Sequence, residues 1–132
     1  EVPTIDIECR ACIDELSVPE IVKVAIYRVV QEALNNIQKY ASARRVEVSV
    51  TAADDGVSLE IRDDGAGFDA IEAMRRSDAR KGMGLASMKE RVDATGGTFW
   101  LESGVGKGTA VSAAWPREAL FLLGDQAVLN SV

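Results

Sequence analysis

One stretch of six residues limits the possible folds most, because it alternates strictly between apolar and polar side chains. In Val57–Arg62 the apolar positions are Val57, Leu59 and Ile61, and the polar ones are Ser58, Glu60 and Arg62. A period of two is typical of a β-strand with one buried and one wet face. Parallel strands are usually buried on both faces, so this strand predicts an antiparallel sheet. Arg45–Thr51 alternates in the same way, and Ala53-Asp54-Asp55-Gly56 between the two predicts a hairpin.

The turn after this strand, Asp63-Asp64-Gly65-Ala66-Gly67-Phe68, combines two carboxylates with two glycines. Glycine tolerates positive φ and has no Cβ, so such a turn can pass close to a flat ring or a phosphate. A carboxylate there can accept a hydrogen bond from an exocyclic amine. The glycines also fit the G-x-G-x-x-A pattern of dinucleotide-binding folds, but that pattern needs a continuously apolar parallel strand before it. An acidic surface turn without a ligand is the alternative.

A long helix is predicted to begin at Ser17-Val18-Pro19-Glu20, where Ser17 can cap and Pro19 suits the first turn, and to end near Ala41. Its apolar face consists of Val22, Ile26, Val29, Val30, Ala33 and Ile37. Its polar stripe consists of Arg28, Glu32, Asn36 and Lys39, with Tyr40 at the edge. An amide oxygen suits Mg²⁺ and a lysine provides a point charge for phosphate. A solvated polar face is the alternative.

A second glycine-rich segment, Gly82-Met83-Gly84-Leu85, leads into a helix predicted to end near Thr95. Glycines before a helix N-terminus can form an anion site, although a simple joint without a ligand is the alternative. The preceding residues 69–81 contain four basic side chains and little apolar content, and we interpret them as a mobile flap. Strands are also predicted for residues 3–9, 98–103 and 108–115, and a short amphipathic helix or docking tail for 117–132. Gly106-Lys107-Gly108-Thr109 is not a phosphate-binding P-loop, because a strand follows it.

Composition excludes several classes of function. The 132 residues suit one domain, and the net charge of −6 argues against a nucleic-acid or anionic-membrane surface. The sequence has no apolar run of membrane-spanning length and no signal peptide. Reduced thiols at Cys9 and Cys12 fit a cytosolic setting, so we expect a cytoplasmic location without direct membrane contact, in a parent protein that can itself be membrane-anchored. The absence of histidine excludes histidine-dependent triads. Cys9 and Cys12 are too few for a zinc site, and Cys9 is expected in the core. The first residue, Glu1, is not methionine, so we expect a fragment.

Four motifs, in this order, resemble the ATP-binding catalytic domain of bacterial sensor histidine kinases. They are the N box Gln31–Ala41, the D-x-G-x-G box Asp63–Phe68, the second glycine box Gly82–Leu85 with Met88–Val92, and the G-x-G-T motif Gly106–Thr109. The wider superfamily also holds DNA gyrase, Hsp90-type chaperones and mismatch-repair ATPases. The resemblance covers about residues 3–116, which predicts a catalytic domain at 1–116 and a tail at 117–132. The short flap and the sequences of these motifs are most similar to those of the subfamily of nitrate sensors and similar kinases.

The resemblance implies roles for the matching residues. Asp63 would bind the adenine amino group, with Thr109 supporting it. Asn36 would ligate Mg²⁺, with Glu32 holding the metal or a water, and Lys39 would meet the phosphates. The glycines that would let the backbone close on the nucleotide are Gly65, Gly67, Gly82 and Gly84. The other residues implied at the nucleotide are Tyr40, Phe68, Lys81, Met83 and Leu85. Two residues depart from the family, Tyr40 where histidine is usual and Asp64 where asparagine is frequent, and both are expected to alter affinity.

The implied fold is an α/β (α+β) two-layer sandwich, in which a mixed, mostly antiparallel sheet carries helices on one face. The implied chemistry is transfer of the ATP γ-phosphoryl group to a histidine on a separate dimerisation domain, and from there to a response regulator. Two alternatives stay open at this point. One is an ATP hydrolase in which Glu32 activates water, and the other is a nucleotide-binding module without catalysis.

Overall fold

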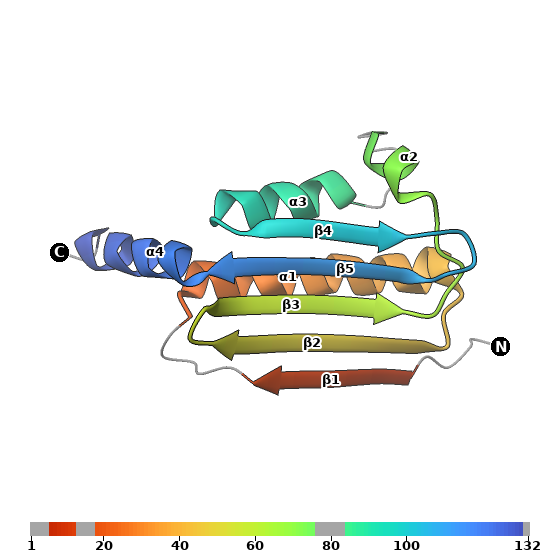
Figure 1. Cartoon of the computed structure of the whole chain (residues 1–132), viewed down its shortest axis with the longest axis horizontal. Coiled ribbons are helices and arrows are strands. Elements are labelled where there is room, and N and C mark those ends of the chain that lie inside the picture. Colours follow the sequence, from red (N-terminus) through yellow and green to blue (C-terminus); the bar gives the residue numbers. More distant parts are fainter. Residues whose placement is uncertain (1–5, 13–17, 76–83, 131–132) are drawn as a thin grey trace.

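The computed structural model describes residues 6–12, 18–75 and 84–130, and side-chain environments at Ile7, 18–73 and 84–123. Its five strands are β1 (Asp6–Cys12), β2 (Arg45–Ala53), β3 (Gly56–Asp63), β4 (Thr98–Ser103) and β5 (Thr109–Pro116). They form one sheet in the order β1-β2-β3-β5-β4 (Figure 1). β1 pairs with β2 in parallel, and the other pairs are antiparallel. The predicted mixed, mostly antiparallel sheet is therefore confirmed, and the antiparallel neighbours of β3 exclude a dinucleotide-binding βαβ unit there.

The helical segments are α1 (Glu20–Asn36), η1 (Ile37–Ala41), α2 (Ala70–Arg75), α3 (Leu85–Ala94) and α4 (Arg117–Asn130). α1 and α3 lie against the same face of the sheet, which confirms the two-layer sandwich (Figure 1). Strand register explains which face is covered, because Ile61 stands opposite Val48 on one side and Val111 on the other, and all three are buried. These alternating positions form the core under the two helices.

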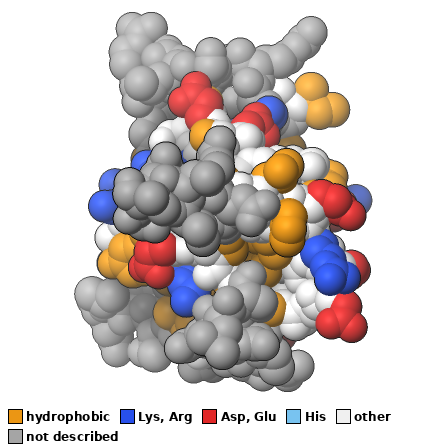
Figure 2. All heavy atoms as spheres, turned by 90° about the vertical axis from the view of Figure 1, so that its left-hand side faces the viewer, with side chains coloured by type: hydrophobic (Ala, Val, Ile, Leu, Met, Phe, Trp, Pro, Cys, Tyr) orange, Lys and Arg blue, Asp and Glu red, His pale blue; other side chains and the backbone are white. Residues whose placement is uncertain are grey.

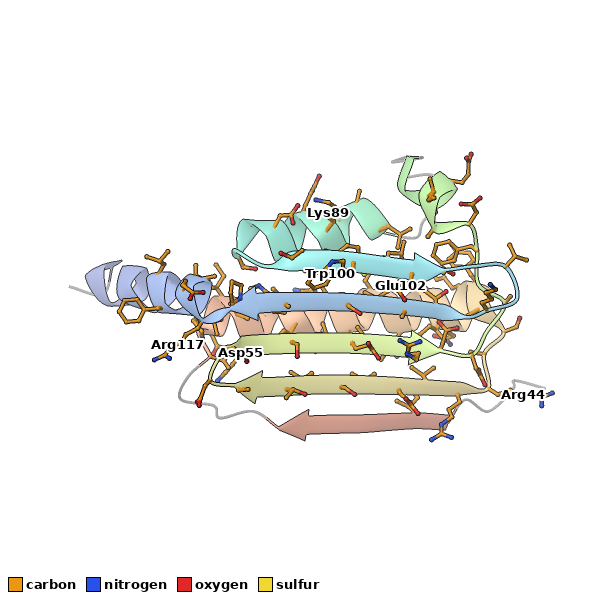
Figure 3. The ribbon with its side chains drawn as sticks, viewed as in Figure 1. Arg44, Asp55, Lys89, Trp100, Glu102 and Arg117 are labelled. Carbon is orange, nitrogen blue, oxygen red and sulfur yellow. The ribbon has the colours of Figure 1, made fainter. Side chains whose placement is uncertain are left out.

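The opposite face of the sheet is polar, as the alternation predicts. Glu60 and Arg62 form an ion pair of 3.2 Å on this face. Trp100 and Glu102 lie on β4 (Figure 3), and Trp100 is half exposed. From the α4 end of the molecule, acidic, basic and hydrophobic side chains all reach the surface among the described residues (Figure 2). Ile7 pairs with the buried Val46 and so belongs to the helix-facing side, but it is exposed because β1 is an edge strand two strands away from β3, over which α1 packs.

The long helix begins slightly later than predicted, and its predicted end near Ala41 is confirmed, although its last five residues are π-helical. It begins at Glu20, after Pro19, whose carbonyl accepts hydrogen bonds from the N–H groups of Val22 and Lys23. The predicted cap Ser17 lies outside the described residues. At its other end α1 continues into the π-helical segment η1, which ends at Ala41 and is followed by Ser42 with φ 51°. Segments of this kind are often found at functional sites, and here the segment lies in the N box.

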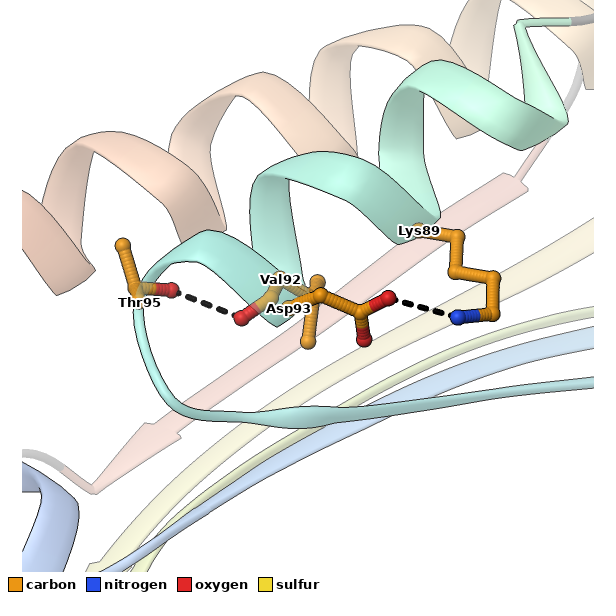
Figure 4. A network of polar contacts seen from close by, with 4 residues as sticks. All are labelled: Lys89, Val92, Asp93 and Thr95. Carbon is orange, nitrogen blue, oxygen red and sulfur yellow. Dashed lines mark hydrogen bonds and ion pairs between the residues drawn. The ribbon is translucent and has the colours of Figure 1, made fainter.

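The end of α3 is joined to the sheet by a buried polar contact. The Thr95 hydroxyl donates to the Val92 carbonyl at 3.0 Å (Figure 4) and accepts from the indole N–H of Trp115 at 2.8 Å. Trp115 is fully buried, so this partner satisfies an N–H that would otherwise be unpaired. On the outer face of the same turn, Lys89 pairs with Asp93 at 2.5 Å. The hydrogen bond from Trp115 therefore holds the C-terminal end of α3 against β5.

The predicted tail is helical. Leu120 of α4 packs against the core, and the N–H of Arg117 donates to the carbonyl of Asp55 at 2.9 Å, beside the β2–β3 turn (Figure 3). Whether the domain boundary falls at residue 116 stays a prediction. No helix in the described parts of the chain combines the length and hydropathy needed to cross a membrane.

Candidate functional site

A cavity of about 210 Å³ opens at the end of the sheet where β3 ends and β5 begins. The residues that line it are Ala33, Asn36, Ile37, Tyr40, Ala41, Ile61, Asp63, Gly67, Phe68, Leu85, Leu101, Thr109 and Val111. They come from α1, η1, three strands, the turn after β3 and the start of α3. Most of the walls are apolar, and the few polar groups are therefore the ones that can orient a ligand.

Asp63 is the most buried of the polar groups, with 6 % of its surface exposed. It stands opposite Thr109 in the β3–β5 register, so a carboxylate and a hydroxyl lie side by side. One carboxylate oxygen, Oδ1, accepts a hydrogen bond from the N–H of Gly65 at 2.7 Å. Burial raises the pKa of Asp63, and the N–H of Gly65 opposes this rise. A carboxylate in these surroundings gains most from a ligand that donates a hydrogen bond to it.

Thr109 is held by Ser103, a residue that the sequence reasoning missed. The Ser103 hydroxyl lies 2.8 Å from the Thr109 hydroxyl, accepts from the N–H of Phe68 at 2.9 Å and donates to the carbonyl of Gly108 at 3.0 Å. One signal in the sequence could have identified Ser103: it is a hydroxyl residue at the last position of a predicted strand, where the alternation places it on the core face. Ser103 therefore connects the G-x-G-T turn to the turn that follows β3.

The second carboxylate of the turn, Asp64, does not line the cavity. Its Oδ1 accepts hydrogen bonds from the backbone N–H groups of Arg44 at 2.9 Å and Arg45 at 3.0 Å. Both donors lie at the start of β2, where Figure 3 labels Arg44. The N–H groups of Arg45 and Arg44 lower the pKa of Asp64. These hydrogen bonds hold the Asp64 carboxylate against the start of β2, and its expected effect on nucleotide affinity stays a prediction.

The same turn is fastened to the end of η1. The N–H of Ala66 donates to the carbonyl of Ala41 at 2.6 Å. A Cβ built on Gly65 would lie 2.3 Å from that carbonyl oxygen, so only glycine fits there. Gly67 has φ 67°, and a Cβ on it would lie 2.1 Å from the carbonyl oxygen of Gly104. The two glycines thus allow the turn to pack between η1 and the β4–β5 loop.

The helix side of the site brings together only part of the predicted stripe. Asn36 and Tyr40 line the cavity, whereas Lys39 is exposed and lies outside its lining. Glu32 is also outside the lining, and its carboxylate lies against Gly84, where a Cβ would be 2.3 Å from Oε1. Gly84, with φ 61°, immediately precedes α3, so Glu32 approaches the N-terminal end of that helix.

Three predicted residues, Lys81, Gly82 and Met83, lie outside the described residues, as does the second part of the predicted flap, residues 76–81. The first part of the flap contains the short helix α2. Leu85 and Phe68 both line the cavity as apolar walls. Of the other apolar walls, Ile37 and Ile61 had been predicted only as apolar positions of a helix and a strand, and Leu101 and Val111 had not been singled out. Hydrophobic periodicity cannot separate a core position from a ligand-facing one, so these residues carried no separate signal.

No group of three or more acidic, cysteine or histidine side chains that could hold a metal occurs in the described segments. Mg²⁺ commonly keeps several waters and binds through substrate phosphates with only one or two protein ligands. The amide of Asn36 at the cavity therefore fits a cation that arrives with a nucleotide, and a preformed metal cage is absent from the described part. The Asp63 carboxylate and the Thr109 hydroxyl, side by side in an apolar cavity, likewise fit an aminopurine ring.

The sequence is similar to several sensor histidine kinases over about 70 % of its length. It is 43 % identical over 94 residues to the sensor histidine kinase YhcY of Bacillus subtilis, covering 69 % of this chain and 23 % of that protein. It is 39 % identical over 94 residues to the histidine-protein kinase/phosphatase DegS of the same species, covering 71 % and 24 %. With the oxygen sensor histidine kinase NreB of Staphylococcus carnosus, identity is 38 % over 97 residues, covering 72 % and 26 %. The chain thus spans about a quarter of the length of these relatives.

Solved structures support the fold. The histidine kinase domain of the blue-light activated kinase EL346 from Erythrobacter litoralis superposes with a TM-score of 0.70 at 21 % identity, covering 90 % of this chain and 54 % of that one. The histidine kinase AdeS of Acinetobacter baumannii gives a TM-score of 0.67 at 17 % identity, covering 87 % and 55 %. Residues 21–119 match the family described as histidine kinase-, DNA gyrase B-, and HSP90-like ATPase. The resemblance found in the sequence motifs is thereby confirmed, and the chain belongs to this ATPase family.

Proposed function

We propose that this chain is the ATP-binding catalytic domain of a two-component sensor histidine kinase. In the proposed reaction it presents the γ-phosphoryl group of Mg-ATP to a histidine on a separate dimerisation domain of the same protein. A response regulator then receives the phosphoryl group. The chain itself contains no histidine, so the acceptor imidazole has to come from elsewhere.

The observation that carries the proposal is the position of Asp63 at the base of an apolar cavity. An exocyclic amine can donate to its carboxylate while the ring contacts apolar walls such as Ile61 and Val111. Thr109 lies beside it in the register and provides a second polar group at the same end. This combination suits an adenine ring better than a sugar or a peptide, because most of the lining is apolar.

The remaining residues would act on the phosphates. Asn36 lies on the opposite wall and can offer its amide oxygen to Mg²⁺, which would neutralise phosphate charge during transfer. Lys39, exposed on η1, can reach toward phosphates outside the cavity. In the transfer, the bond from the γ-phosphorus to the ADP oxygen would break, a phosphorus–nitrogen bond would form, and the imidazole would release its proton to water. The chain contributes positioning and charge, which is most of what phosphoryl transfer requires.

In the test, the chain is mixed with a dimerisation domain that carries the acceptor histidine, and γ-labelled ATP is added. We expect label on the partner domain that is labile in acid and stable in base, because a phosphoramidate has these properties. Asn36→Ala should abolish the labelling, and Asp63→Asn should reduce it in line with its weaker binding of Mg-ATP. Asn35→Ala is the matched control, since Asn35 is an exposed neighbour on α1 outside the cavity lining and should leave labelling intact.

The same experiment separates the two alternatives. Brisk ATP turnover by the chain alone that is lost in Glu32→Ala would favour a hydrolase. In the structure Glu32 lies against Gly84 and outside the cavity lining, which does not favour that role. Nucleotide binding without labelling of a competent partner domain would instead favour a binding module and contradict the kinase proposal.

A further inference from the structure

We propose that Ser103 determines the base preference of the cavity by fixing the direction in which the Thr109 hydroxyl donates. The proposal rests on the proposed function, since it assumes that the Asp63 end of the cavity receives a purine. Ser103 itself does not line the cavity, so its effect is exerted through Thr109, which does. Ser103 is thus a positioning residue for base recognition.

The direction follows from counting hydrogens on the two hydroxyls. A serine hydroxyl has one hydrogen and two acceptor lone pairs. Its hydrogen is used on the carbonyl of Gly108, which can only accept. One lone pair accepts from the N–H of Phe68. The contact of 2.8 Å with Thr109 then has to use the other lone pair, so the Thr109 hydroxyl is the donor in that pair.

This assignment leaves Thr109 with no hydrogen for the cavity. Its hydroxyl oxygen can therefore only accept from a ligand, and the neighbouring carboxylate of Asp63 also only accepts when ionised. Two acceptors side by side favour the amino group that adenine carries at position 6. They oppose the carbonyl oxygen that guanine and hypoxanthine carry at the same position. Base discrimination would then depend on both groups, with Ser103 keeping Thr109 in its accepting orientation.

Removing the Ser103 hydroxyl should change preference more than overall affinity. In Ser103→Ala the Thr109 hydroxyl loses its acceptor and becomes free to turn its hydrogen toward a carbonyl at position 6. The ratio of Mg-ADP to Mg-IDP affinity, measured by calorimetry on the 132-residue chain, should fall by about threefold to about tenfold, the effect of one hydrogen bond. Ser103→Thr retains a hydroxyl and should restore the ratio. Ser112→Ala is the control, because Ser112 stands opposite Trp100 on the polar face of the same hairpin.

The outcomes separate this proposal from the proposed function. An unchanged ratio in a Ser103→Ala chain that still binds Mg-ADP overturns the role of Ser103 and leaves the nucleotide site in place. An equal loss for both nucleotides also overturns it, since that is the effect of a purely structural role. A wild-type chain that binds neither nucleotide overturns the proposed function itself. If Ser103→Ala does not fold by circular dichroism, Ser103→Cys, with a thiol that hydrogen-bonds weakly, is judged by the same ratio.

Discussion

Replacing Asp63 with asparagine tests the cavity most directly, because the substitution changes charge and hydrogen bonding with little change in shape. The native carboxylate has two oxygens, one of which accepts from the N–H of Gly65 at 2.7 Å while the other can accept from a ligand amine. Asparagine has one oxygen. Whichever way its amide is turned, an NH₂ group faces either the N–H of Gly65 or the amine of the base.

The expected loss is that of one hydrogen bond to a charged group. Such a bond contributes about 1.5 to 3 kcal/mol, which corresponds to about tenfold to about a hundredfold in the dissociation constant of Mg-ATP. GTP has no amine at position 6, so its affinity should change less and the preference for ATP should narrow. Binding of both nucleotides is measured by calorimetry. An Asp63→Asn chain that binds Mg-ATP with wild-type affinity would refute the assignment of Asp63 to the base.

The fold should survive this change. Burial raises the pKa of Asp63 above its ordinary value of 3.8, so the folded chain holds this proton more tightly than the unfolded chain. The contribution of Asp63 to stability therefore decreases as pH rises from 3.8 through its raised folded pKa, and the ionised carboxylate destabilises the free protein at neutral pH. The uncharged amide of the Asp63→Asn chain would not carry that cost. Urea denaturation at neutral pH should show no large loss of stability in Asp63→Asn, and a large loss would mean that the binding defect reflects unfolding.

Three further predictions concern the surrounding residues. Asn36→Ala should weaken Mg-ATP binding much more than binding of metal-free adenosine, and equal losses by calorimetry would exclude the metal role. Asp64→Asn should reduce the free energy of unfolding near neutral pH but much less in acid. The reason is that the lowered pKa of Asp64 provides stability that is lost as pH falls below 3.8 through the pKa of the folded chain. A loss of unfolding free energy that is the same at every pH in denaturation experiments would contradict this. Gly84→Ala should cost about 1 to 2 kcal/mol of stability from its left-handed backbone, φ 61°. Adding Glu32→Ala should relieve only the clash with Oε1, so full recovery would argue against backbone strain.

The strands and their turns could be predicted from sequence because each depends on local patterns. Alternation predicted β3 between Val57 and Asp63 and showed which side is buried, and the acidic glycine turn followed directly. The family motifs then placed the acidic turn and the N box at one site. The structure confirms that Asp63, Thr109 and Asn36 share a cavity, while their chemical roles stay predictions.

Other features could not be predicted because they depend on contacts between distant segments. The π-helical turn of η1 covers only five residues, too few for apolar spacing to distinguish from an α-helix. The direction of Asp64 is set by the backbone of Arg44 and Arg45, which no side-chain pattern encodes. Ser103 acquires its importance only when β4 and β5 pair and bring it against Thr109.

The strand order also determines when the cavity can exist during folding. The β2–β3 and β4–β5 pairs are local hairpins, whereas the β3–β5 pair joins segments far apart in the chain and forms the contact between them. Local pairs close faster than distant ones, because less loop entropy is lost. Asp63 belongs to one hairpin and Thr109 to the other, so the cavity is complete only after the hairpins have docked. A bound nucleotide would consequently slow unfolding of the chain far more than it would speed its folding.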